Sequence, residues 1–328
     1  MNTLIVLVTG ATGFIGQKLC RSLLEVGYSV RGTYRRPQPA MCELPQVDWI
    51  QISDINSDTC WTNAVRNVGY VIHLAALAHQ VGGRGEGRLD EFMAINAEGT
   101  ACLAKAVARQ PTIKRFLFVS SIAAVCSFSD SVISAQTPPH PDTDYGRSKL
   151  AAEEHVRAVL AHGQPDWCIL RPPLVYGPGN PGNMSRLLKL VNTGIPLPLK
   201  HLENKRTFIY VGNLIEAVER CLWHPGASRR TFLVGDSETL STPELIQLIA
   251  QKTEKAVRLF AMPPNIMLTA SRAGNLLSRV TGWSVGLDSY SLSRLTGSLY
   301  LDTSDIRESI EWSPSFTLAD GLDRTLFQ

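Results

Sequence analysis

Residues 4–8 form a short apolar run, Leu-Ile-Val-Leu-Val, that leads directly into the glycine-rich segment 9–16, Thr-Gly-Ala-Thr-Gly-Phe-Ile-Gly. The run predicts a buried strand, and the apolar periodicity from Phe14 to Val26 predicts a helix. Glycines at a strand-to-helix turn let the backbone approach a phosphate, while the first helical amides offer N–H donors and a partial positive charge. This feature predicts a parallel α/β fold that holds a pyrophosphate with main-chain atoms.

The same strand-and-helix alternation continues through the first two thirds of the chain. Short apolar segments predict further buried strands at 29–34, 49–52, 70–75, 115–120 and 167–171. Repeated β-α units imply right-handed crossovers and a parallel sheet covered on both faces. We therefore predict the α/β class, with a doubly wound parallel Rossmann sheet that binds ligands at the carboxyl ends of its strands.

The pattern becomes irregular after Pro172, where prolines and glycines interrupt the helical runs. We predict a dinucleotide-binding Rossmann domain over residues 1–172 and a smaller C-terminal substrate-binding lobe mainly over 173–328. The two are interwoven, because segments near 206–220 and 231–251 return to the sheet; within them, 231–234 is predicted as a strand and 242–251 as a helix. The glycine-rich loop 82–88 fits a surface loop and a substrate-contacting lid equally well.

Composition excludes several classes of protein. The chain has 328 residues and a net charge of +3, too mild to indicate nucleic-acid binding, and no run approaches the length of a membrane helix. Seven dispersed cysteines without Cys-x-x-Cys pairs predict free thiols and no metal site. The expected location is the cytoplasm.

Tyr145 and Lys149 stand four residues apart at the start of a helical run, so both side chains project from one face. A nearby ammonium favours the phenolate and lowers the pKa of a tyrosine, which suits it to proton transfer. Ser121 follows the strand predicted at 115–120 and is the expected hydroxyl that hydrogen-bonds the reacting oxygen. The alternative is that Ser120 and Ser121 only cap that strand.

Other motifs follow in order along the chain. They are 71–76 (Val-Ile-His-Leu-Ala-Ala), Asn96 with Gly99 and Thr100, 170–178 (Leu-Arg-Pro-Pro-Leu-Val-Tyr-Gly-Pro) and 206–211 (Arg-Thr-Phe-Ile-Tyr-Val). With the glycine turn, Ser121, Tyr145 and Lys149, this ordered set resembles the extended short-chain dehydrogenases/reductases of the NAD-dependent epimerase/dehydratase family, over nearly the whole chain.

The resemblance implies roles for individual residues. Ser121, Tyr145 and Lys149 would be catalytic. The nicotinamide cofactor would contact Gly10, Thr12, Gly13, Phe14, Ile15, Gly16, Arg35, Arg36, Asp54, Ile55, Leu74, Ala75, Ala76, Tyr145, Lys149, Pro172 and Val175. A nucleotide-sugar substrate would contact Asn180, Arg206 and Arg294. His73 is interpreted as a satisfied core histidine, and Asn96 as a support for the site.

The residues after the second strand bear on the choice of cofactor. A carboxylate there would bind the adenine ribose of NAD, but the segment 31–36 has none and ends in Arg35 and Arg36, which suit a 2′-phosphate. NADP(H) is therefore favoured and NAD(H) stays possible. The alternative is that the two arginines belong to an ordinary basic loop.

The segments 295–302 and 311–314 resemble nucleotide-sugar 4-ketoreductases of bacterial surface-polysaccharide synthesis. The predicted function is NADPH-dependent reduction of a nucleotide-linked 4-keto-6-deoxy sugar, such as UDP-2-acetamido-2,6-dideoxy-hexos-4-ulose, for O-antigen or lipopolysaccharide precursors. The alternative is an NAD-dependent UDP-sugar 4-epimerase. A ketone reductase of another substrate class and a non-catalytic NADP-binding protein are further alternatives. A homodimer through helices near 91–109 and 150–162 is expected.

Overall fold

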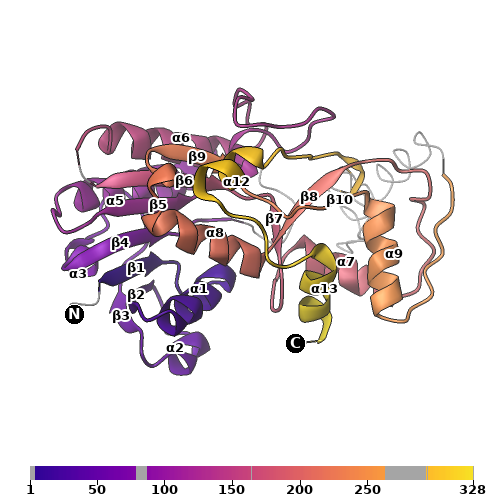
Figure 1. Ribbon diagram of the computed structural model, residues 1–328, viewed down its shortest axis with the longest axis horizontal. Helices are drawn as coiled ribbons and strands as arrows, with labels where there is room; N and C mark the ends of the chain where they lie inside the picture. The colour runs from indigo at the N-terminus through magenta and orange to yellow at the C-terminus, as the bar shows by residue number, and fades with distance from the viewer. Residues whose placement is uncertain (1–3, 79–86, 164, 263–292, 294, 328) are drawn as a thin grey trace.

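The computed structural model describes residues 4–78, 87–163, 165–262, 293 and 295–327. Its centre is a parallel sheet of seven strands in the order β3-β2-β1-β4-β5-β6-β9 (Figure 1). The strands are β1 (Ile5–Thr9), β2 (Ser29–Tyr34), β3 (Asp48–Gln51), β4 (Val68–His73), β5 (Arg115–Val119), β6 (Asp166–Arg171) and β9 (Arg230–Leu233). The predicted doubly wound α/β fold is confirmed.

Alternate residues of each strand face opposite layers of helices. Val6 and Val8 of β1 join one buried cluster, and Leu7 joins another. The first layer includes α1 (Phe14–Glu25) and α8 (Val211–Trp223); the second includes α3 (Thr62–Val65), α5 (Gly99–Ala108) and α6 (Asp144–Val159). The short helix α2 (Pro39–Glu43) lies between β2 and β3 in the chain. Because both faces are covered, the central strands β1, β4 and β5 are mostly apolar, which is why the sequence marks them clearly, whereas β2 and β3 nearer the edge also contain polar residues.

A second, smaller sheet lies beside the first, at the right of Figure 1. Its strands are β10 (Thr239–Leu240), β8 (Arg206–Tyr210) and β7 (Leu174–Tyr176), and the helices around it are α7 (Asn183–Asn192), α9 (Thr242–Lys252) and α13 (Leu318–Phe327). The start of α9 is fixed by a capping box, in which Ser241 and Glu244 each bond the other's backbone N–H.

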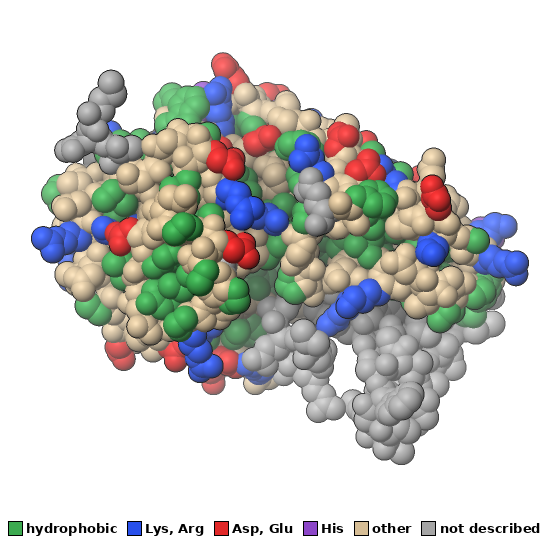
Figure 2. Space-filling view, turned by 90° about the horizontal axis from the view of Figure 1, so that it is seen from below, with side chains coloured by type: hydrophobic (Ala, Val, Ile, Leu, Met, Phe, Trp, Pro, Cys, Tyr) green, Lys and Arg blue, Asp and Glu red, His purple; other side chains and the backbone are tan. Residues whose placement is uncertain are grey.

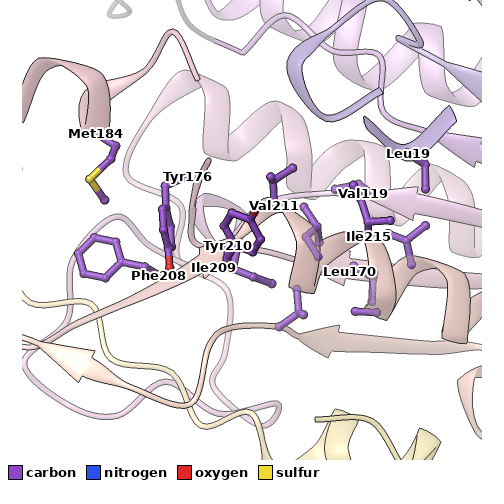
Figure 3. Close-up of a cluster of buried hydrophobic side chains, with 14 of the residues drawn as sticks. Leu19, Val119, Leu170, Tyr176, Met184, Phe208, Ile209, Tyr210, Val211 and Ile215 are labelled. Carbon is purple, nitrogen blue, oxygen red and sulfur yellow. The ribbon is translucent and has the colours of Figure 1, made fainter. Parts of the chain in front are cut away.

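The core continues from the large sheet into this lobe. Leu19 of α1 and Leu170 of β6 belong to the same buried cluster as Tyr176, Met184 and Phe208, which Figure 3 shows as one row of side chains. The two parts therefore share one core, while the division into two interwoven domains and the boundary at residue 172 stay predictions.

The remaining elements are short. They are α4 (Leu89–Phe92), the π-helical turn η1 (Met93–Glu98), the 3₁₀ turns η2 (Ile122–Ala124) and η3 (Pro225–Ala227), and α12 (Ser304–Ile310). No helix in the described ranges is long and apolar enough to cross a membrane. On the face seen in Figure 2, positive and negative side chains are interspersed. All seven cysteines, each within the described residues, are free thiols, as predicted.

Most strand predictions agree with the structure to within two residues, and one difference has a local cause. The fourth strand was predicted at 70–75 but ends at His73. Residue Ala75 leaves the ladder because its N–H donates to the hydroxyl of Thr9. Most of the loop 82–88 lies outside the described residues.

Candidate active site

The carboxyl ends of β1 and β4 meet at the point where the strand order reverses, since β2 follows β1 in the chain but lies on its other side. Ligands of doubly wound sheets bind at such a point. Gly10 has a φ of +69°, and a Cβ there would lie 2.9 Å from the Ala75 backbone nitrogen. A side chain at position 10 would therefore close the space between the two strand ends.

The N-terminus of α1 points its first amides toward this crevice. Gly13 is the N-cap residue; it has no side chain to bond these amides, and the first turn contains no acidic residue. The preceding loop is held by Gln17, whose Nε2 donates to the Thr12 carbonyl at 2.7 Å. Backbone donors and the helix dipole together fit a pyrophosphate.

The predicted catalytic residues come from the turn η2, which follows β5, and from α6. Thr143 caps α6 by accepting from the Gly146 N–H at 3.1 Å. A Cβ at Gly146 would collide with the Ala123 carbonyl, so the first turn of α6 lies directly on η2. Ser121 caps η2, because its Oγ accepts from Ala123 N at 3.2 Å. The structure thus brings the turns that carry Ser121 and Tyr145 together.

Tyr145 and Ser121 are both half-buried. The Tyr145 ring meets Phe92 edge-on, with centroids 6.0 Å apart. The capping contact of Ser121 agrees with the alternative that this residue has only a capping role. The contact uses the oxygen only as an acceptor, however, and leaves the hydroxyl proton available to another partner. Capping and hydrogen bonding to a substrate are therefore compatible roles.

Lys149 is only 2% exposed, at the carboxyl end of β5. Its Nζ donates to the Val119 carbonyl at 3.0 Å and lies 4.2 Å from the centroid of the Phe118 ring. Burial lowers the pKa of this ammonium to about 7, and the negative charge of Glu153 opposes that decrease. A lysine in this state can hydrogen-bond a ribose and change its charge near neutral pH.

Glu153 was not singled out from the sequence, although it lies one helical turn beyond Lys149. Its carboxylate is fully buried and accepts from the Ser120 hydroxyl at 2.6 Å. Arg171 donates to both carboxylate oxygens, at 2.9 and 2.7 Å, and Arg157 donates to one of them at 2.8 Å. This network fixes the helix that carries Lys149 to the ends of β5 and β6.

In the basic segment after β2, where the adenine is predicted to bind, Arg35 forms an ion pair. Arg35 Nη1 donates to Asp54 Oδ1 at 3.1 Å, and the two side chains are 64% and 82% exposed. Asp54 follows β3, so a carboxylate lies at the neighbouring strand end, and its contact with a cofactor stays a prediction. Arg36 is exposed, whereas Ile55 beside Asp54 is buried.

The residues predicted to border the nicotinamide lie in a tightly bonded segment. The Pro172 carbonyl accepts from Ile122 N at 2.9 Å, which joins β6 to η2. The Val175 carbonyl accepts from the Asn180 side-chain amide. Leu74, Ala75 and Ala76 are partly buried just beyond β4. Their contacts with a cofactor stay predictions.

The predicted substrate residues have contacts within the chain. Asn180 holds its own loop, because its Oδ1 also accepts from Gly182 N at 2.5 Å. Arg206 is buried, and its NH1 donates to the Gly297 carbonyl at 3.1 Å. Arg294 lies outside the described residues. Both Asn180 and Arg206 therefore shape the lobe, and their contact with substrate stays a prediction.

The sequence is similar to those of known proteins along nearly its whole length. The model of a family described as "NAD dependent epimerase/dehydratase family" matches residues 6–235. A UDP-glucose 4-epimerase of Vibrio cholerae is 33% identical, with 98% of this chain and 94% of that protein covered. An N-acetyl-alpha-D-glucosaminyl-diphospho-ditrans,octacis-undecaprenol 4-epimerase of Escherichia coli O157:H7 is 25% identical, covering 98% and 94%.

A solved structure has the same fold. The UDP-glucuronic acid 4-epimerase from Bacillus cereus in complex with NAD superimposes with a TM-score of 0.74 at 20% identity, covering 98% of this chain and 97% of that one.

Proposed function

The chain belongs to the NAD-dependent epimerase/dehydratase family, and from that premise we propose that it is a 4-epimerase of a sugar carried on a diphosphate, with a UDP-sugar as the first candidate. One observation carries the chemistry: a buried Lys149 one helical turn beyond Tyr145, at the strand ends that form the crevice. Epimerisation is chosen over net reduction because two full-length relatives are named as 4-epimerases.

The crevice fits a nicotinamide dinucleotide. The turn at Gly10 and the first amides of α1 would hold its pyrophosphate, and Lys149 would hydrogen-bond a ribose hydroxyl. When bound, the dinucleotide supplies reversible hydride transfer at its nicotinamide ring. Buried apolar side chains of β4 and β5 pack beneath the sheet and hold these strand ends in place.

The side chains of the site handle the proton. Tyr145 would take the proton of the sugar 4-hydroxyl and return it after the sugar has presented its other face, so that no proton is consumed. The Lys149 ammonium favours the phenolate form of Tyr145. Ser121 would donate its hydroxyl proton to the reacting oxygen and hold it in place.

One observation favours a second candidate, NADPH-dependent reduction of a 4-keto-6-deoxy sugar such as UDP-2-acetamido-2,6-dideoxy-hexos-4-ulose. Arg35 and Arg36 follow β2, where a carboxylate would otherwise bind the ribose of NAD. The ion pair with Asp54 weighs against it, because a 2′-phosphate must compete for Arg35. The O-antigen role, the homodimer and the cytoplasmic location stay predictions.

A single assay separates the two candidates. Purified protein is incubated with UDP-glucose or UDP-N-acetylglucosamine without added cofactor, and in parallel with the 4-keto-6-deoxy sugar nucleotide and NADPH. Interconversion of the UDP-hexoses supports epimerisation, whereas stoichiometric loss of NADPH absorbance with the keto sugar moves the assignment to reduction. Dinucleotide released on denaturation is identified by mass, with NAD expected for the epimerase.

Variants of two tyrosines test the role given to Tyr145. Tyr145→Phe is expected to lose turnover and keep dinucleotide binding, because only the phenol hydroxyl is removed. Tyr28→Phe is the matched control, since Tyr28 precedes β2 at the opposite edge of the sheet. Turnover of the Tyr145 variant equal to that of the control would refute the acid-base role.

A further inference from the structure

A buried chain of hydrogen bonds runs through His73, the last residue of β4. The imidazole has no exposed surface. Its Nδ1 lies 2.6 Å from the Thr9 hydroxyl and its Nε2 lies 2.9 Å from the Thr100 hydroxyl. The ring also stacks on Phe118, with centroids 5.5 Å apart. A satisfied core histidine was predicted, and both ring nitrogens indeed have partners.

The donors and acceptors of this chain have fixed directions. Thr100 Oγ1 donates its single proton to the Asn96 carbonyl at 2.5 Å, so it must accept from His73 Nε2–H. A neutral imidazole has only one N–H, hence Nδ1 accepts from the Thr9 hydroxyl. The Thr9 oxygen in turn accepts from Ala75 N at 3.3 Å. The bonds therefore run in one direction, from the Ala75 amide to the Asn96 carbonyl.

The surroundings of His73 favour the neutral ring. Burial, followed by the positive charge of Lys149 on α6, lowers the pKa of His73 to about 3. The other elements around the ring present Thr9 from β1, Thr100 from α5 and Phe118 from β5, none of which carries a charge.

This chain of hydrogen bonds links the segment after β4 both to the glycine turn and to α6. Ala75 is held by Thr9, the residue just before the glycine turn. Two residues on, Leu77 is held by Asn96, which accepts from Leu77 N at 2.7 Å and donates to its carbonyl at 3.1 Å. Asn96 also donates to Ser148 of α6 at 3.0 Å. Residues 74–77 are thus fixed at two points.

We propose that His73, as the neutral Nε2–H tautomer, is a positioning residue that sets residues 74–77 against the turn at Gly10 and thereby sets the affinity for the dinucleotide. The proposal rests on the dinucleotide site of the proposed function. Its physical basis is the close approach of the two segments, since even a Cβ at Gly10 would come within 2.9 Å of Ala75 N. A small displacement of Ala75 therefore changes the space left for a pyrophosphate.

The tautomer is tested by nitrogen NMR of the full chain labelled at histidine. The His73 signals are expected to show a protonated Nε2 and an unprotonated Nδ1, unchanged between about pH 5 and pH 8, where an ordinary histidine titrates. A protonated Nδ1, or titration within that range, would overturn the proposal.

The positioning role is tested with near-isosteric variants. Thr9→Val removes the bonds of the Thr9 hydroxyl to His73 and Ala75, and Thr100→Val removes those of the Thr100 hydroxyl to His73 and Asn96. Thr112→Val is the control, because the Thr112 hydroxyl donates to the Val68 carbonyl at the opposite edge of the sheet. Thr9→Val is expected to weaken dinucleotide binding about tenfold, which corresponds to about 1.4 kcal/mol. Thr9→Ser keeps the hydroxyl and is expected to bind the dinucleotide with wild-type affinity. Thr112→Val is expected to keep wild-type affinity as well.

Two negative results are distinguishable. In the first, the wild-type protein and Thr9→Val bind the dinucleotide equally well, while Thr9→Val and Thr100→Val lose similar thermal stability. Thr9 and His73 are then merely structural, and the positioning role fails while the proposed function stands. If the wild-type protein binds no dinucleotide, the proposed function and the positioning role fail together.

Discussion

Replacing Lys149 by methionine is expected to stabilise the free protein and abolish turnover. The side chain is buried, and its pKa falls from 10.5 to about 7 mainly because the ammonium loses its hydration. At about 1.4 kcal/mol per pKa unit, keeping this charge in the folded chain costs about 5 kcal/mol. Methionine has a similar shape and no charge, but it leaves the Val119 carbonyl without its donor, which costs about 1–3 kcal/mol. The expected net gain is about 2–4 kcal/mol.

The gain depends on pH in a definite direction. Below about pH 7 the folded and unfolded wild-type chains are both protonated at Lys149, and the full penalty applies. Between about 7 and 10.5 the unfolded chain keeps the proton while the folded chain releases it, so wild-type stability rises with pH. The advantage of Lys149→Met therefore shrinks above neutral pH and is largely gone by about pH 9.

Urea unfolding of the nucleotide-free protein, followed by tryptophan fluorescence at about pH 6 and pH 9, measures this difference in free energy. Lys105→Met is the control, because Lys105 is exposed on α5 and its replacement should change stability by less than about 0.5 kcal/mol at either pH. A Lys149 variant less stable than wild type at the lower pH, or an advantage independent of pH, would refute the reasoning.

Three further predictions concern other parts of the site. Glu153→Gln should lower the free energy of unfolding by about 3–5 kcal/mol, because it leaves the buried charge of Arg171 unpaired. Arg157→Ala, at the half-exposed end of the network, should lower it by only about 1 kcal/mol, and equal losses in urea unfolding would contradict the network. Gly10→Ala places a Cβ on a residue in a left-handed conformation, which costs on the order of 1–2 kcal/mol of stability. It should also weaken dinucleotide binding, measured by calorimetry, more than tenfold (~1.4 kcal/mol of binding free energy), and unchanged binding would count against the crevice as the binding site. Under the second candidate, NADPH-dependent reduction, Arg35→Ala should weaken NADPH binding and spare NADH in fluorescence titrations, and equal losses would refute the phosphate role of Arg35.

Much of the fold is determined locally and could be read from the sequence. Both faces of the large sheet are covered, so its central strands β1, β4 and β5 are mostly apolar runs that stand out between polar turns. The glycine turn at 9–16 specifies its own backbone, because position 10 needs a positive φ. Tyr145 and Lys149 share a face through helical periodicity alone. None of these features requires a distant residue, so one sequence was enough to predict them.

Tertiary structure decided the partners of the polar residues. Asp54 meets Arg35, Arg171 meets Glu153, and Thr9 meets His73. These pairs are 19, 18 and 64 residues apart in the chain. Arg35 meets Asp54, and Thr9 meets His73, because parallel strands bring their carboxyl ends to one edge of the sheet, whereas Glu153 meets Arg171 because helix α6 packs on the end of β6. The direction of the His73 bonds depends further on which donors the folded chain leaves beside each acceptor. The sequence therefore determined which chemical groups are present, and the packing of the sheet decided which of them are charged, paired or available to a ligand.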